Sequence, residues 1–298
     1  MEENKNNGNV VMLVVIAIIT MIIVVVGATF AYLASNVEPE DSAGVQATTS
    51  GSSDLLLFNI DKNLLELNVT ERELCKGDEC GDVSVYTNAN VVYQTNTPGN
   101  SQKFDISIDV GDGANNFGYT SGACLDKNDL EVGDEGLDNQ YSCEAIEGNH
   151  WQSDTTVAEL VLDVYEGVPA ESCDSGKGKC VDKSSDRVLT LGDDQVITNE
   201  QDCATVEGSR WVPDVFEAGI CYSVMATRDI TDANGGTVVV VSDREILADG
   251  EDKVIQYYRV AVGMRNLTHN QVLNANKHFA GTLNFKINNQ AEEPDLGE

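Results

Sequence analysis

Apolar and polar residues alternate along much of the chain after residue 35. In 103–110 every second residue is apolar, from Phe104 to Val110. A period of two places these side chains on one face of a β-strand. Further short apolar or alternating runs predict strands at 55–58, 64–69, 156–165, 187–191, 237–241, 254–264 and 283–287.

Sustained helical periodicity is rare in the same region. The runs are rich in β-branched residues and separated by glycine-containing turns, such as 232–236 before the run at 237–241. This pattern favours an all-β sandwich over an α/β fold. Short helices are expected only in long loops, for instance near 270–277.

The N-terminal region has a different pattern. Residues 10–33 are nearly all apolar, which is long enough for a helix to span a bilayer. We therefore expect one hydrophobic helix within 1–34, either retained as a membrane anchor or cleaved as a signal peptide. Small residues allow cleavage between Ala31 and Tyr32, and 26–28 offer a second site. The rest of the chain would be the exported side.

The remaining domain organisation follows from composition. Residues 35–53 are small and polar, and predict an extended linker or arm. A β-sandwich domain is expected over 54–290, with insertions at about 120–222. Residues 291–298 form an acidic tail without a sortase-type motif.

Charge limits the possible partners. The 298 residues carry 18 Lys and Arg against 50 Asp and Glu, a formal net charge of −32. Such a field repels phosphate backbones, so nucleic acid is excluded as a partner. The charge suits a solvated exterior, cation binding or salty surroundings.

The cysteines indicate disulfides. No pair has the C-x-x-C spacing of a zinc ribbon or a thioredoxin-like site. Each lies among polar residues and after the apolar segment, which is typical of disulfides formed outside the cytoplasm. The eight are Cys75, Cys80, Cys124, Cys143, Cys173, Cys180, Cys203 and Cys221.

A repeat lies between residues 120 and 222. Both copies have the pattern C-[LV]-D-K, a spacer, then C-x-x-[IV]-E-G-x-x-W-x-x-D, starting at Cys124 and Cys180. The two tryptophans of the chain, Trp151 and Trp211, fall at matching positions. Each copy predicts a loop that is closed by a disulfide, with a tryptophan covering the cystine. In the chain-entropy model, a cross-link that closes a loop of this length stabilises the folded state by about 3 kcal/mol.

Two pairing schemes satisfy this pattern. In the first, each copy closes internally, which leaves Cys75–Cys80 and Cys173–Cys221. In the second, Cys173–Cys180 and Cys203–Cys221 form local loops, while Cys124–Cys143 and Cys75–Cys80 remain. The copies are interpreted as insertions in the sandwich, serving either as surface-binding loops through their tryptophans or as simple elaboration.

No catalytic or metal-binding motif is present in the sequence. The three histidines show no metal-ligand spacing, and no nucleophile elbow or phosphate-binding loop occurs. An acidic loop starting at Asp126 lacks the glycine that an EF-hand needs at its sixth position. We therefore expect no enzyme activity, no metal site and no cofactor, with calcium as a weak alternative.

The two ends of the chain resemble the TasA/camelysin family. Residues 27–35 (GATFAYLAS) resemble its export signal, and 49–55 its opening strand. Residues 258–262 (YRVAV), 276–277 and 279–285 (FAGTLNF) resemble its closing strands. The central cysteine repeats depart from that family's plan. The resemblance implies a jelly-roll-like sandwich, secretion through a dedicated signal peptidase, and a biofilm-matrix or surface-fibre role.

The resemblance also implies a mode of assembly. An N-terminal arm, here roughly 32–49, would complete the sheet of the next subunit by β-augmentation. We therefore expect an extracellular or cell-surface structural protein, such as a matrix or pilus-like fibre subunit. It would self-assemble, and would be membrane-tethered through 10–33 if that segment is uncleaved. The alternatives are a monomeric binding module for a glycan, protein or cation, and a hydrolase with paired carboxylates.

Overall fold

The computed structural model describes residues 44–288 with gaps. The gaps are 50–53, 75–81, 98, 134–135, 174–177, 183–189, 192–194, 198, 207–208, 249–252 and 268; only the backbone is described for 44–49, 182, 190–191 and 195–196. The predicted N-terminal helix, Ala31, Tyr32, Cys75, Cys80 and the acidic tail lie outside the described residues. Within the described ranges, no helix combines the length and the apolar character that crossing a bilayer requires.

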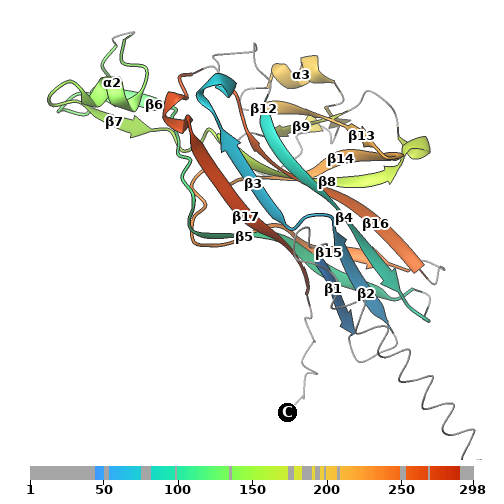
Figure 1. Ribbon diagram of the computed structural model, residues 1–298. Helices are drawn as coiled ribbons and strands as arrows, with labels where there is room; N and C mark the ends of the chain where they lie inside the picture. The colour runs from blue at the N-terminus through green and yellow to red at the C-terminus, as the bar shows by residue number, and fades with distance from the viewer. Residues whose placement is uncertain are drawn as a thin grey trace, which may run out of the picture. The chain divides into compact units, whose positions relative to one another are not determined.

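Two antiparallel sheets contain most of the described strands (Figure 1). The larger sheet has the spatial order β1 (Gly44–Thr49), β2 (Leu55–Ile60), β4 (Val83–Gln94), β16 (Lys253–Met264), β8 (Leu160–Pro169), β14 (Ile220–Asp229) and β13 (Val215–Glu217). The smaller sheet has the order β15 (Gly236–Leu247), β5 (Ser101–Asn115), β17 (Lys277–Ile287) and β3 (Leu64–Val69).

Strand pairing is nested along the chain. β3 pairs with β17, β4 with β16, β5 with β15, and β8 with β14, all antiparallel. Successive pairs alternate between the smaller and the larger sheet. The chain therefore follows one long antiparallel ribbon that passes from one sheet to the other three times, with β2 and β1 added to the larger sheet beside β4.

The main hydrophobic core lies between the two sheets. Alternate residues of strands from both sheets are buried in one apolar cluster. At its centre the rings of Phe58, Phe104, Tyr258 and Phe285 have centroids 5.6–6.2 Å apart. Aromatic pairs at this spacing stabilise beyond their buried area by about 0.5–1.5 kcal/mol. The predicted packing of two sheets face to face is present.

Most predicted strands coincide with observed ones. Predicted runs fall in β2, β3, β5, β15, β16 and β17, and the run at 156–165 overlaps β8 from Leu160 onward. Of the run at 187–191, the described residues 190–191 form the short β10. Two long strands, β4 and β14, were not predicted. In β4 the outward residues Asn88 and Asn90 are poor strand formers, and they hide the buried alternation of Ala89, Val91 and Tyr93.

The two sequence repeats form two small modules, which lie well apart in Figure 1. Module 1, residues 122–153, is inserted between β5 and β8; module 2, residues 178–213, is inserted between β8 and β14. Module 1 contains β6 (Gly122–Leu125), α2 (Gln140–Glu144) and β7 (His150–Ser153); module 2 contains β9 (Gly178–Asp182), the hairpin β10 (Thr190–Leu191) and β11 (Gln195–Val196), α3 (Glu200–Ala204) and β12 (Ser209–Pro213). Short 3-10 helices lie in the connections: η1 (Glu71–Glu73), η2 (Ala170–Ser172) and η3 (Val272–Asn274).

Candidate functional site

Each module is closed by a disulfide between its first strand and its helix. For the six cysteines that the structure describes, the pairing is that of the first scheme considered from the sequence. All except Cys173 are buried, although each lies among polar residues in the sequence. The three bonds are Cys124–Cys143, Cys180–Cys203 and Cys173–Cys221.

The tryptophan of each module lies opposite a cysteine of its disulfide. Trp151 of β7 pairs with Cys124 of β6, and Trp211 of β12 pairs with Cys180 of β9. Residues directly opposite on antiparallel strands have their side chains on the same face. Each indole is therefore placed over its disulfide and is only partly exposed. The two residues proposed from the sequence as surface-binding groups thus also form part of the interior of their modules.

A glycine that sequence reasoning missed makes room for each indole. A Cβ atom on Gly122 would lie 2.9 Å from Trp151 Cε2, and one on Gly178 would lie 2.8 Å from Trp211 Cε2. Both distances are much shorter than a van der Waals contact, so a Cβ atom would clash and only glycine fits at these two positions. The signal was available, because G-x-C precedes the C-[LV]-D-K pattern in both copies.

An asparagine N-cap begins the helix of each module. Asn139 accepts a hydrogen bond from Ser142 N at 3.0 Å, and Asn199 accepts one from Asp202 N at 2.8 Å. Asparagine is among the preferred N-cap residues because its side chain satisfies a backbone N–H that the helix leaves unpaired. The repeat therefore extends further than the sequence motif, to N-x-x-x-C at the helix.

Module 2 is packed against the larger sheet. Val181 and Val212 of the module form a buried cluster with Tyr165, Tyr222 and Val224, which lie on the face of that sheet that points away from the main core. Module 1 has no buried side chain in the apolar clusters of the sheets, among the residues described. Module 1 instead carries exposed apolar side chains: Leu130 (64 % exposed), Tyr141 (79 %) and Ile146 (45 %).

One substitution between the repeats accompanies this difference. His150 of module 1 corresponds to Arg210 of module 2. Arg210 forms an ion pair with Asp163 of β8, and the same carboxylate accepts a hydrogen bond from Thr227 at 2.6 Å. His150 lies 3.3 Å from Asp129 of its own module and contributes to no such docking contact. The arginine therefore helps to attach module 2 to the sheet.

The first described strand forms an edge of the larger sheet. The segment expected to be an extended arm, 35–53, contributes β1, which pairs with β2 from Gly44↔Ile60 to Thr49↔Leu55. No other described strand pairs with β1. The sheet therefore extends by one strand beyond the domain boundary expected at residue 54.

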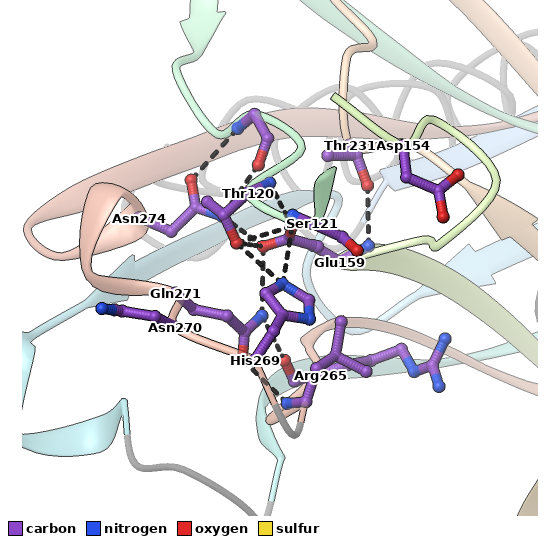
Figure 2. A network of polar contacts seen from close by, with 12 residues as sticks. Thr120, Ser121, Asp154, Glu159, Thr231, Arg265, His269, Asn270, Gln271 and Asn274 are labelled. Atoms are coloured by element: carbon purple, nitrogen blue, oxygen red, sulfur yellow. Dashed lines mark hydrogen bonds and ion pairs between the residues drawn. The ribbon is translucent and has the colours of Figure 1, made fainter. Parts of the chain in front are cut away.

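A fully buried carboxylate lies where three loops meet (Figure 2). Glu159 precedes β8 and accepts hydrogen bonds from residues of the loop after β5 and of the loop between β16 and β17. The donors include Thr120 Oγ1 at 2.8 Å, Gln271 Nε2 at 3.1 Å and Asn274 Nδ2 at 2.7 Å. The backbone N–H groups of Thr120 and Ser121 also donate to it.

A histidine completes this cluster. His269 Nε2 lies 3.3 Å from Glu159 Oε1 and 2.9 Å from Thr120 Oγ1. The backbone N–H of Glu159 itself donates to Thr231 Oγ1 at 3.0 Å, which fixes the start of β8. A hydroxyl, an imidazole and a carboxylate are thus brought together from three separate parts of the chain, and the sequence contained no local signal for this arrangement.

Hydrogen bonding decides the charge of the carboxylate. Burial by itself raises the pKa of Glu159, because the charged form loses its hydration. The hydrogen bonds from His269, Gln271 and Thr120 stabilise the charged form and outweigh this effect, so the pKa lies below its usual value. Glu159 is therefore ionised at neutral pH and acts as an acceptor for its neighbours.

The acidic groups that suggested a cation site have other partners. Asp126 Oδ1 accepts hydrogen bonds from Asn128 N at 2.7 Å and Leu130 N at 3.0 Å, so it shapes its own loop. In the described part of the chain, one further group has ligand atoms close enough to hold a metal: Cys173, Cys221 and Asp214. The two cysteines are bonded to each other there and offer no thiolate.

Comparison with known proteins gives no relative: no protein-family model, no curated protein and no solved structure matches the chain.

Proposed function

We propose that this chain is an exported structural protein of the cell surface that assembles by donating its N-terminal strand to a neighbouring copy. The position of β1 carries the proposal. β1 is the outermost strand of the larger sheet. Among the described strands, it pairs only with β2. The same ladder can form when the strand comes from a second chain, because main-chain hydrogen bonds do not depend on which chain supplies them.

Export is supported by two features of the chain. Residues 10–33 have the length and apolar character of a membrane-spanning or signal segment. The three described disulfides are typical of proteins that mature in an oxidising compartment. The proposed location is the cell surface or the extracellular medium, with a membrane tether where 10–33 are retained.

The nested strand order supports the fold that the family resemblance implies. The pairs β3–β17, β4–β16, β5–β15 and β8–β14 alternate between two sheets, which is the pairing expected for a jelly roll. In this arrangement β2 is the strand beside β4, and β1 covers its free edge. Without β1, β2 would present unpaired backbone groups for another chain to bind. The resemblance and this edge support the proposed matrix-fibre role.

A cross-linking experiment tests the donation of β1. The register places Val45 opposite Asn59. Chains carrying Val45→Cys and differently tagged chains carrying Asn59→Cys are produced together in full length and oxidised. A mixed disulfide dimer is expected, because donation brings the two positions together between chains. The matched control pairs Thr49→Cys with Asn59→Cys; Thr49 lies opposite Leu55, four residues out of register.

The double variant Val45→Cys/Asn59→Cys distinguishes the two arrangements. If β1 remains within its own chain, this variant closes internally and the single variants give no mixed dimer above the level of the control. That result would contradict the proposal that the protein assembles by strand donation. If donation occurs, a chain whose β1 is fixed to its own β2 by the disulfide cannot donate that strand. Negative-stain microscopy then shows filaments only from chains with a free β1.

Surface binding through a module is the second candidate function. Leu130, Tyr141 and Ile146 expose apolar surface on module 1, whose side chains do not join the apolar clusters of the sheets. A soluble monomer that binds a glycan or a protein would lose affinity on Tyr141→Ala. Gln201→Ala is the matched control, since Gln201 occupies the corresponding position of module 2. Equal binding by both variants to isolated cell-wall material would exclude this candidate.

A further inference from the structure

Thr120 has the surroundings of an activated nucleophile. Its side chain is only 2 % exposed, and Oγ1 lies 2.8 and 2.9 Å from the two carboxylate oxygens of Glu159. His269 Nε2 lies 2.9 Å from the same hydroxyl. A hydroxyl within hydrogen-bond reach of a base is the arrangement that covalent catalysis uses to make oxygen nucleophilic. Because the hydroxyl is buried, an outside substrate cannot reach it, and only a neighbouring side chain can react.

Gln271 supplies an electrophile in the same cluster. Its Nε2 donates to Glu159 Oε2 at 3.1 Å, and Thr120 Oγ1 lies 2.9 Å from that same oxygen. The amide nitrogen of Gln271 and the hydroxyl oxygen of Thr120 therefore both lie within hydrogen-bond distance of Glu159 Oε2. Leu267 N donates to Gln271 Oε1 at 2.8 Å, which polarises the amide carbonyl and would stabilise negative charge on its oxygen. Gln271 is itself only 4 % exposed.

We propose that Thr120 and Gln271 form an intramolecular ester cross-link. Glu159 accepts the hydroxyl proton of Thr120 while Oγ1 attacks Cδ of Gln271. The tetrahedral centre collapses with cleavage of the Cδ–Nε2 bond, and Glu159 returns the proton to the departing nitrogen. One Cδ–Oγ1 bond replaces one Cδ–Nε2 bond and one ammonia molecule is released, without an oxidant or other reactant. His269, which contacts Glu159, is partly exposed, so solvent reaches the edge of this cluster.

The second amide in the cluster is less suited to the reaction. Asn274 Nδ2 also donates to Glu159 Oε2, but its carbonyl oxygen accepts from Gly118 N at the longer distance of 3.1 Å. Both amide nitrogens also donate to a backbone carbonyl at 2.9 Å, Asn274 to Gly118 O and Gln271 to Arg265 O, but the side chain of Asn274 is one methylene shorter. Gln271 therefore has the more polarised carbonyl and the longer reach. The proposed bond would join the loop after β5 to the loop between β16 and β17, and does not depend on strand donation.

Mass spectrometry of the full chain tests the cross-link. The expected intact mass is lower than the sequence mass, after allowance for disulfides, by one ammonia molecule. After reduction and trypsin digestion, residues 104–127 and 266–277 are expected as one branched peptide, which fragments at Thr120 and Gln271. Hydroxylamine should separate the two halves, since it cleaves an ester and leaves an amide intact. Ammonia loss by cyclisation at Asn234-Gly235 would map to a different peptide.

Variants separate chemistry from folding. Thr120→Val and Glu159→Gln are expected to abolish the branched peptide, the first because the hydroxyl is removed and the second because the base is removed. Thr120→Ser keeps the hydroxyl and should retain the branched peptide. Circular dichroism of Thr120→Val checks that the sheets still form. Separate, unlinked peptides from the folded parent chain would overturn the proposal, as would a link that maps to Asn274.

Discussion

At the scale of single residues, Glu159 shows how hydrogen bonds keep a buried carboxylate charged. Its pKa is lowered although burial acts in the opposite direction. The folded state therefore binds this proton less readily than the unfolded chain, in which a glutamate has a pKa of about 4.3. The stability that Glu159 contributes is fully present above that value and is lost as the pH falls through the lower folded-state pKa.

Glu159→Gln should reveal this dependence on pH. At pH 7 the variant loses the charge and turns an amide N–H toward groups that are themselves donors. We expect a fall in the free energy of unfolding of at least about 1–3 kcal/mol, the cost of a buried unsatisfied polar group. At a pH of about 3 the difference from the parent should shrink, because this pH lies below the pKa of the unfolded glutamate, and protonation then favours the unfolded parent chain. Urea unfolding at both pH values measures this, and an unchanged difference would contradict it.

The two module glycines give a second prediction at this scale. Gly122→Ala and Gly178→Ala would push a methyl group against a tryptophan and against the facing strand, with Cβ 2.3 Å from Gln152 O and 2.4 Å from Val212 O respectively. We expect each to destabilise its module by about 1–3 kcal/mol, as overpacking does. The readout is the rate at which dithiothreitol reduces the module's own disulfide. Gly133→Ala is the control, because a Cβ there meets nothing within 4 Å.

At the scale of elements, the modules share a construction but differ in attachment. Module 2 contributes Val181 and Val212 to a cluster with the larger sheet, while module 1 contributes no buried side chain to the described clusters of the sheets. Loss of structure in module 2 should therefore expose Tyr165, Tyr222 and Val224, which lie on β8 and β14. Loss of structure in module 1 should leave both sheets covered as before.

This difference predicts unequal effects of removing the two disulfides. The loops they close are of similar length, with sequence separations of 19 and 23, so each bond should be worth about 3 kcal/mol to its own module. Cys180→Ser/Cys203→Ser should lower the melting temperature of the sandwich. Cys124→Ser/Cys143→Ser should leave that transition nearly unchanged. Calorimetry of both double variants checks this, and equal shifts of the main transition would show that module 1 is also coupled to the sheets.

Elements with one apolar and one polar face could be predicted from the sequence. β5 was visible because its buried residues, Phe104 to Val110, alternate with charged or hydroxyl residues. β4 was not, because asparagines occupy its outer face; β1 lies in a polar segment that resembles a linker. The Glu159 cluster joins residues more than a hundred positions apart in the chain, from Thr120 to His269. Only the nested strand pairing brings them together, and no local pattern encodes that pairing.

At the scale of the whole molecule, net charge must oppose any assembly. Each chain carries a formal charge of −32, so two copies repel each other before their strands can pair. The repulsion acts over the Debye length, which is about 30 Å at 0.01 M salt and about 8 Å at 0.15 M. Hydrogen bonds between β1 and β2 act only at contact. Screening should therefore remove the barrier to assembly and leave the ladder itself unchanged.

Assembly should consequently increase with ionic strength. In sedimentation velocity experiments on the full chain, we expect monomers at about 0.01 M salt and growing oligomers as the salt rises through about 0.15 M, where the Debye length falls below 10 Å. The internally closed Val45→Cys/Asn59→Cys variant has the same surface charge but no free β1, and should stay monomeric throughout. Its behaviour separates strand donation from simple salting-out, which would precipitate both proteins alike. Oligomers that form at low salt and dissociate at high salt would mean that charge attraction drives assembly, and strand donation would not account for them.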